Sequence, residues 1–389
     1  MSRTVLNKLL TQSFENYNVL FNELKFHNHN AHHLGSLYFL GATDDKLEKA
    51  YEVMCKRLVP YQTSPHEINL SNWRTYLGNK DFCKSYRDFF HEQLTKSGNE
   101  WHKKFKEFLL DNQDHPLING SIGGLAHPLI HIGYALELDS QIVGIEALTT
   151  TAVSYNYLHE VVDKLKPPKS PSKSALEIFK DIHLDNRLPI YDTPGVDTLE
   201  VVVKNYTDLV LSHYDQWNMN KENIEKTIEE LFDLAVYLYG ATHKPNEIEF
   251  DFFLLHLVTA MHGIRIIHPH INNQQVSEHI LLAFFYFSIV IYICQLRPEI
   301  NEQLINDYKI ENAKNNWNYV TECVLNTELM NDAHAVKVIR ALKDAEKVYG
   351  NKNGFYLKTA VKNVDSVNIE DIWVGGSDDQ RQLNVLKRS

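Results

Sequence analysis

Twenty histidines occur in this 389-residue sequence, and those best placed for chemistry lie inside apolar or helical segments. Four segments contain them: 26–42, 123–137, 250–270 and 331–342. A buried imidazole needs a hydrogen-bond partner or a metal ion to offset the loss of its water. Neutral imidazole is also the commonest metal ligand near neutral pH, so one shared metal ion would explain all four segments together.

The spacing within two of these segments places several rings on shared helix faces. His127 and His131 stand four residues apart in GGLAHPLIHIGYALE, and the proline after the first histidine predicts a helix start with His127 at the cap. His29, His32 and His33 recur at three- and four-residue intervals, so a helix would gather them on one face.

The other two segments add His256, among large apolar residues, and His334, which has Lys337 one turn later on the same face. Asp332 could cap that last helix or orient His334. Several histidines with few carboxylates suit Fe, Cu, Zn or Ni better than Mg or Ca. Each residue also has a structural alternative. A lone buried histidine such as His256 is more often a hydrogen-bonded core residue, and the ammonium of a lysine such as Lys337 usually reaches water.

We expect six histidines to be solvated or partly exposed: His27, His33, His66, His91, His102 and His115.

Helices must position these side chains, and most of the sequence has helical periodicity. Apolar residues recur every three or four positions in 44–59, 99–110, 221–240 and 335–350. Alternating strand patterns are scarce, so we predict an all-α fold.

The helices are expected to form a single large helical domain over residues 1–374. Within it, 187–203 could include a short extended piece. The Pro-, Lys- and Ser-rich stretch 164–174 predicts an exposed loop, and 375–389 predicts a polar, disordered tail.

The composition is that of a soluble globular protein, with 43% hydrophobic and 23% charged residues. The net charge of −11 and the lack of a basic stripe argue against a nucleic-acid partner. The uncharged run 280–296 is shorter than the ~20 residues that span a membrane, so we expect a buried central helix and no membrane association.

Sequence motifs exclude several other classes of protein. The four cysteines form no zinc spacing or disulfide framework, and the N-terminus lacks a secretory signal, which favours a reducing, cytoplasmic location. Dinucleotide-binding, P-loop, H-E-x-x-H and G-x-S-x-G motifs are absent.

At the same four histidine segments the chain resembles the questin oxidase-like family. The matching pieces are NHNAHHLGSLYFLGA (28–42), NWRTYLGN (72–79), GGLAHPLIHIGYALE (123–137), DFFLLHLVTAMHGIRI (251–266) and NDAHAVKVIRAL (331–342). They follow the family order, and the resemblance covers roughly residues 15–365. The chain departs from the family pattern at Ala31, where a proline is expected between the first two histidines.

The resemblance implies an oxidoreductase that acts on aromatic polyketides. The reaction that gives the family its name is an NADPH-dependent, oxygenative opening of an anthraquinone ring, formally a Baeyer–Villiger oxidation. The resemblance also implies a non-haem iron (Fe²⁺) held by histidines and a carboxylated lysine. The implied ligands are His29 or His32, His127 or His131, His256, His334 and Lys337, the last two also being assigned to catalysis.

The expected small molecules are an aromatic substrate and O₂. Because no glycine-rich turn offers its backbone N–H groups to phosphate, we expect NADPH to act indirectly, as the reductant of a partner reductase. The alternative function is a non-catalytic helical protein that retains the fold and binds a metal such as zinc, or a small molecule.

Overall fold

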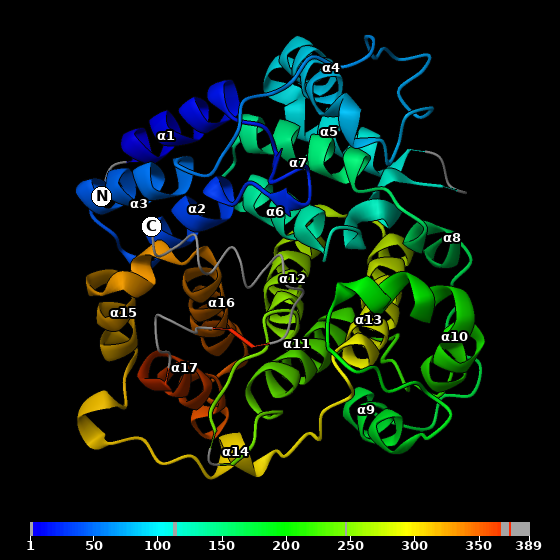
Figure 1. Cartoon of the computed structure of the whole chain (residues 1–389), viewed down its shortest axis with the longest axis vertical. Helices are drawn as coiled ribbons and strands as arrows, with labels where there is room; N and C mark the ends of the chain where they lie inside the picture. Colours follow the sequence, from blue (N-terminus) through cyan, green and yellow to red (C-terminus); the bar gives the residue numbers. More distant parts are fainter. Residues whose placement is uncertain (1–2, 112–114, 246, 367–372, 375–389) are drawn as a thin grey trace. The chain divides into compact units, whose positions relative to one another are not determined.

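The computed structural model describes residues 3–111, 115–245, 247–366 and 373–374, and helices account for nearly all of their regular structure (Figure 1). The predicted all-α class is therefore confirmed. The chain forms two compact units, the first comprising Met1–Lys164, Gly263–Asn272 and Leu329–Lys337, and the second comprising the rest. The single helical domain over residues 1–374 stays a prediction beside this division into two units.

The elements of the first unit include α1 (Arg3–Asn16), β1 (Leu20–Phe21), β2 (Phe26–His27), α2 (Asn30–Leu40), α3 (Asp44–Cys55), α4 (Cys83–Lys96), α5 (Trp101–Leu110), the 3₁₀ helix η3 (Leu117–Ile122), α6 (His127–Glu137), α7 (Gln141–Val153) and α8 (Leu158–Val162). The second unit contains α9 (Ala175–Leu184), α10 (Leu199–Tyr214), α11 (Ile224–Gly240), α13 (Gln274–Cys294), α14 (Gln303–Asn306), α15 (Trp317–Asn326) and α17 (Phe355–Ser366). Helices α12 (Leu254–Ile267) and α16 (Ala333–Tyr349) contribute residues to both units.

Helices α6 and α7 form the centre of the first unit and lie side by side (Figure 1). Every residue of α6 from His127 to Leu136 is buried, as is every residue of α7 from Val143 to Val153. Helix α7 packs on α1, α4 and α5, and α2 packs on α6. The apolar segment around His127 and His131 is therefore core, and its imidazoles are core residues too.

A pair of glycines lets the backbone of α6 approach that of α12 closely. A Cβ atom on Gly133 would lie 2.7 Å from the Cα of Gly263, and one on Gly263 would lie 2.9 Å from the carbonyl oxygen of Leu129. Real side chains do not tolerate such distances, so both positions require glycine.

A short hairpin precedes the first histidine helix and was not predicted from the sequence. Leu20 pairs with His27 and Phe21 with Phe26, and the turn between them contains a left-handed backbone at Asn22, Glu23 and Leu24. Strands of two residues leave too little alternation to detect.

The apolar run 280–296 belongs to α13, and its residues from Ile280 to Cys294 are all buried. Within the described part of the chain, α13 is the helix long and apolar enough to cross a membrane, and 83% of its most apolar window is buried inside the protein. It packs on α10 and α11. The predicted buried helix is confirmed, and burial within the protein accounts for its composition.

The loop predictions have mixed outcomes. Residues 164–174 are irregular and mostly exposed, as predicted, although Leu165 and Pro168 are buried. In the described backbone 187–203 contains no strand, because a loop and a short 3₁₀ turn lead directly into α10. The predicted tail, 375–389, lies outside the described residues.

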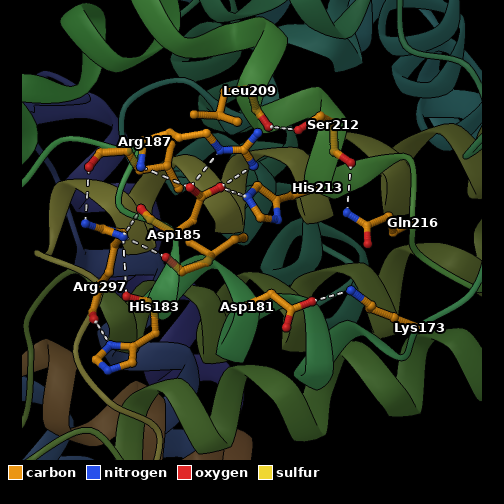
Figure 2. Close-up of polar contacts among 12 residues, drawn as sticks. Lys173, Asp181, His183, Asp185, Arg187, Leu209, Ser212, His213, Gln216 and Arg297 are labelled. Carbon is orange, nitrogen blue, oxygen red and sulfur yellow. Dashed lines mark hydrogen bonds and ion pairs between the residues drawn. The ribbon is translucent and has the colours of Figure 1, made fainter.

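In the second unit, the buried side chain of Arg297 binds the end of α9 (Figure 2). Its Nη1 donates to the carbonyl oxygens of Ile182 and Asp185, each at 2.8 Å, and its Nη2 donates to that of Leu188 at 3.2 Å. The last carbonyls of a helix have no partner within the helix, so Arg297 acts as a C-terminal cap.

The carboxylate of Asp185, the residue that follows α9, accepts hydrogen bonds from two side chains (Figure 2). It accepts from Nε2 of His213 at 2.7 Å and from Nε of Arg187 at 2.9 Å. Hydrogen bonds from Arg187 and His213 outweigh the burial of this carboxyl and hold its pKa well below the usual range. Asp185 therefore stays ionised at neutral pH.

We expect Arg297→Met to lower the free energy of unfolding by about 3 kcal/mol, because buried carbonyl oxygens lose their donors. Urea unfolding followed by circular dichroism measures this. Arg187→Ala removes an exposed guanidinium from the same network and should leave the unfolding midpoint nearly unchanged. Equal losses in the two variants would contradict the capping role of Arg297.

Candidate metal centre

His29 and His127 bring two ring nitrogens together inside the first unit. His29 is the N-cap residue of α2, and His127 is the first residue of α6. Both are buried, and their Nε2 atoms lie 3.0 Å apart. The predicted cap position is wrong by one residue, because Ala126 is the N-cap of α6.

Backbone carbonyls determine which nitrogen of each ring carries the hydrogen. Nδ1 of His29 lies 2.5 Å from the carbonyl oxygen of His27, and Nδ1 of His127 lies 2.7 Å from that of Gly124. A carbonyl oxygen only accepts, so each Nδ1 must donate. In the neutral rings each Nε2 then has a lone pair, and the two lone pairs face each other.

A shared cation is the arrangement that makes this contact favourable. Burial, with smaller contributions from Lys337 and His27, lowers the pKa of His29 well below its usual value, so a shared proton is disfavoured. Two nitrogens each about 2.1 Å from one metal ion lie about 3.0 Å apart when the angle at the metal is close to 90°. The observed separation therefore fits two metal ligands.

A strained turn orients His127. Gly124, Leu125 and Ala126 all have a left-handed backbone, with φ values of 54°, 59° and 58°. Such a conformation costs about 1–3 kcal/mol for a residue other than glycine and is typical of functional sites. It directs the Gly124 carbonyl toward the ring of His127, which also stacks on His27 with ring centroids 4.4 Å apart.

His334 joins this pair from the start of α16. Asp332 caps the helix as predicted, accepting at Oδ1 from the backbone N–H groups of His334 and Ala335, both at 2.9 Å. The ring centroids of His334 and His29 lie 4.6 Å apart. One ring nitrogen from each of His29, His127 and His334 lies within 4.8 Å of the others. These three residues are called the histidine cluster below.

Lys337, one turn after His334, is only 1% exposed. Burial, partly opposed by the nearby charge of Asp332, lowers the pKa of Lys337 to about 7. The alternative in which its ammonium reaches water is therefore wrong. A large fraction of this amine is neutral at physiological pH, which is the state that reacts as a nucleophile.

His32 and His131 form a second buried pair beside the pair of His29 and His127. Nε2 of His32 lies 3.1 Å from Nδ1 of His131, and Nε2 of His131 lies 3.4 Å from Oε2 of Glu146. Glu146 was missed from the sequence. Its signal is a single acidic residue in the otherwise uncharged stretch QIVGIEALTTTAV, where a buried carboxylate requires a partner.

His256 lies in the second unit, at the start of α12, and is fully buried. Its Nδ1 lies 2.7 Å from the carbonyl oxygen of Phe252, as the core alternative predicts. The same bond leaves Nε2 as the nitrogen with a lone pair, as in His29 and His127. Its role as a ligand stays a prediction.

Two histidines expected at the surface are buried instead. Nε2 of His27 lies 3.3 Å from Oγ of Ser154, and Nε2 of His33 donates to the carbonyl oxygen of Met330 at 2.7 Å. The expectation of at least partial exposure holds for the others named above, His66, His91, His102 and His115.

The fold and the histidine cluster define a mostly helical protein with buried histidines that could bind a metal ion. The chain belongs to the questin oxidase-like family, whose model matches residues 26–342.

Relatives of this chain include named oxidoreductases from fungi. It is 26% identical over 359 residues to oxidoreductase AflY of Aspergillus parasiticus, covering 86% of this chain and 71% of that protein. It is 22% identical to Baeyer-Villiger oxidase ptaJ of Pestalotiopsis fici and 21% identical to questin oxidase of Aspergillus terreus, in each case over 88% of this chain and 80% of the relative. Distant relatives of this chain are thus oxidoreductases, and several are Baeyer-Villiger oxidases.

The buried His33 predicts that the metal-free protein loses stability in acid. Burial lowers the pKa of His33 to about 4, so between neutral pH and about pH 4 the unfolded chain binds a proton here that the folded chain does not. We expect His33→Gln, which keeps a donor for the Met330 carbonyl, to reduce the slope of unfolding free energy against pH near pH 5 by up to about 1.4 kcal/mol per unit.

Urea unfolding of the metal-free protein across this pH range measures the slope. His66→Gln, at an exposed position, is the matched control and should leave the slope unchanged. Parallel curves for wild type and His33→Gln would contradict the prediction.

Proposed function

We propose that this protein is an oxygen-dependent oxidoreductase that opens the ring of an aromatic polyketide, such as an anthraquinone, by a Baeyer–Villiger-type oxidation at a non-haem iron site. The observation that carries the proposal is the pair of Nε2 lone pairs, on His29 and His127, that face each other 3.0 Å apart in a buried cluster. The activities named for the relatives support the reaction class.

The residues present fit a ferrous ion. His29, His127 and His334 would hold it, with His256 as the further histidine ligand that the family resemblance implies. Imidazole ligands suit iron, and the carbonyl bonds at Nδ1 keep Nε2 available as the ligand atom. When bound, iron supplies the one-electron chemistry with O₂ that no side chain in this protein provides.

Lys337 would supply the anionic ligand as a carbamate. Its neutral amine attacks CO₂, forming an N–C bond and releasing one proton, which leaves a carboxylate oxygen on the side chain. An ammonium here would instead repel each unit of metal charge by about 4 kcal/mol at 4 Å and an effective dielectric constant of 20, and a dication by about twice that. Modification of Lys337 removes this repulsion.

The reaction requires two electrons and two protons besides O₂. One oxygen atom is inserted between a carbonyl carbon and its ring neighbour, and the other leaves as water. We propose that NADPH supplies the electrons through a partner reductase, in a cytoplasmic setting where the four cysteines stay free thiols.

The pair formed by His32 and His131 would share one proton through a hydrogen bond between the two rings. Nε2 of His32 and Nδ1 of His131 lie 3.1 Å apart, and Oε2 of Glu146 lies 3.4 Å from Nε2 of His131. All three side chains are buried, so bulk water does not compete for this proton.

Metal content tests the proposal directly. Protein reconstituted anaerobically with ferrous iron should retain close to one equivalent per chain, and His127→Ala should retain almost none because one of the two facing nitrogens is lost. His256→Ala tests whether that residue is also a ligand, and the exposed His66→Ala is the matched control.

Elemental analysis measures the bound metal. Zinc in protein purified without added metal, with no iron retained after reconstitution, would favour the non-catalytic binding protein. Absence of any bound metal after reconstitution would overturn the proposal.

A second prediction concerns the carbamate on Lys337. Lys337→Ala should lose iron, with partial recovery on addition of a short carboxylic acid that replaces the carbamate oxygen. Protein incubated with ¹³C-labelled CO₂ should show a carbamate carbon signal by NMR that is absent from Lys337→Ala. Lys343→Ala, which removes a half-buried lysine of the same helix, is the control and should keep the signal. An unmodified Lys337 amine in iron-loaded crystals would refute the assignment.

A further inference from the structure

A second group of potential metal ligands lies at the surface of the first unit. Nδ1 of His115 is 2.6 Å and Nδ1 of His159 is 2.9 Å from the same oxygen, Oδ2 of Asp163. One ligand atom from each of the three side chains lies within 4.8 Å of the others. None of these residues belongs to the histidine cluster.

A hydrogen bond from Asn119 orients the carboxylate of Asp163. Nδ2 of Asn119, in η3, donates to Oδ1 of Asp163 at 2.7 Å, which leaves Oδ2 directed at the two imidazoles. Burial raises the pKa of Asp163, but hydrogen bonds from Asn119, His159 and His115 outweigh it and lower the pKa overall. The carboxylate is therefore ionised, as a metal ligand must be.

The two imidazoles approach this buried carboxylate from the solvent side. The side chain of Asp163 is 5% exposed, that of His159 27% and that of His115 61%. The ring of His159 is fixed by stacking on Tyr155, with centroids 4.3 Å apart. The group thus has an oriented carboxylate, one fixed imidazole and one exposed imidazole through which an ion can enter.

We propose that His115, His159 and Asp163 form a surface site for a late first-row divalent cation, with Zn²⁺ as the best match. Two imidazole nitrogens and one carboxylate oxygen are typical zinc ligands, and Mg²⁺ or Ca²⁺ would prefer more oxygen. Water completes the coordination on the exposed side. Asn119 orients the ligating carboxylate in the way that outer partners do in metal sites.

Binding requires the Nδ1 atoms of His115 and His159 to move away from Oδ2 of Asp163. Ligands about 2.0–2.1 Å from zinc in a tetrahedral site lie about 3.3 Å apart, so the two nitrogens must move a few tenths of an ångström from Oδ2. For Nδ1 to bind the ion, the hydrogen on each ring moves from Nδ1 to Nε2 by exchange with solvent. The loop position of His115, before η3, permits this movement.

An ion at this site would also link two chain segments, because its ligands come from both. His115 and Asn119 belong to the segment that leads to His127, whereas His159 lies on α8. The same segment already packs closely on residues 154–155, because a Cβ on Gly123 would lie 2.1 Å from the carbonyl oxygen of Ser154. Zinc should therefore stabilise the approach to the histidine cluster, by the usual linkage between binding and folding.

Calorimetric titration of ZnCl₂ into the chelator-treated full-length protein tests the proposal. Wild type should bind one more equivalent of Zn²⁺ than His115→Ala, and excess Mg²⁺ should not displace it. His115 is exposed, so its loss should leave the fold intact. His91→Ala removes an exposed imidazole that packs on Phe14 and should match the wild type.

An anomalous diffraction peak at the zinc edge between His115, His159 and Asp163 would confirm the position. Zinc should also raise the thermal midpoint of wild type and His91→Ala more than that of His115→Ala. The same Zn²⁺ stoichiometry in wild type and His115→Ala would overturn the proposal, and this outcome is independent of the iron content of the histidine cluster.

Discussion

The contact between Nε2 of His29 and Nε2 of His127 is the constraint on which the site depends, because two acceptor nitrogens 3.0 Å apart repel unless a cation lies between them. Each ring is held by a carbonyl from its own chain segment, two or three residues earlier. Local backbone geometry therefore sets the direction of each ring. The packing of α2 on α6 then sets the distance between the two nitrogens.

Charge in the cluster follows from the same burial. Lys337 is one of the causes that lower the pKa of His29, His32 and His27, and burial lowers the pKa of Lys337 itself to about 7. Burial therefore disfavours a proton on each of these four bases, and their lone pairs need another cation as a partner. A dication meets this need, provided that Lys337 is not an ammonium beside it.

Much of this arrangement could be predicted from the sequence, because burial leaves a periodic signal. Four histidines could be predicted as buried because they lie inside apolar helical segments: His32, His127, His131 and His256. The uncharged run 280–296 predicted the buried helix α13. Asp332 was predictable as a cap because an N-cap acts within its own turn.

Features that depend on contacts between distant segments could not be predicted. Whether His29 or His32 faces His127 depends on the register between α2 and α6, which spacing within one helix does not encode. The left-handed backbone at Leu125 and Ala126 has no glycine to signal it. His33 is buried because Met330, nearly three hundred residues later, covers it.

The packing of α2 on α6 connects two histidine spacings, three residues at the start of α2 and four residues on α6. Each helix contributes two imidazoles one turn apart, so the helices form two cross-helix pairs: His29 with His127, and His32 with His131.

The pairs differ in how their hydrogens are fixed. Carbonyls fix Nδ1 of both rings in the first pair, whereas Nδ1 of His32 has no hydrogen-bond partner among the described residues. A ring with a fixed tautomer presents a permanent lone pair and suits a metal ligand. A ring whose tautomer is not fixed can carry its hydrogen on either nitrogen. In the second pair, Glu146 lies next to His131. One helix–helix contact thus produces two imidazole pairs one turn apart, one with fixed tautomers that suits the proposed metal ion and one in which Nδ1 of His32 is not fixed by a carbonyl.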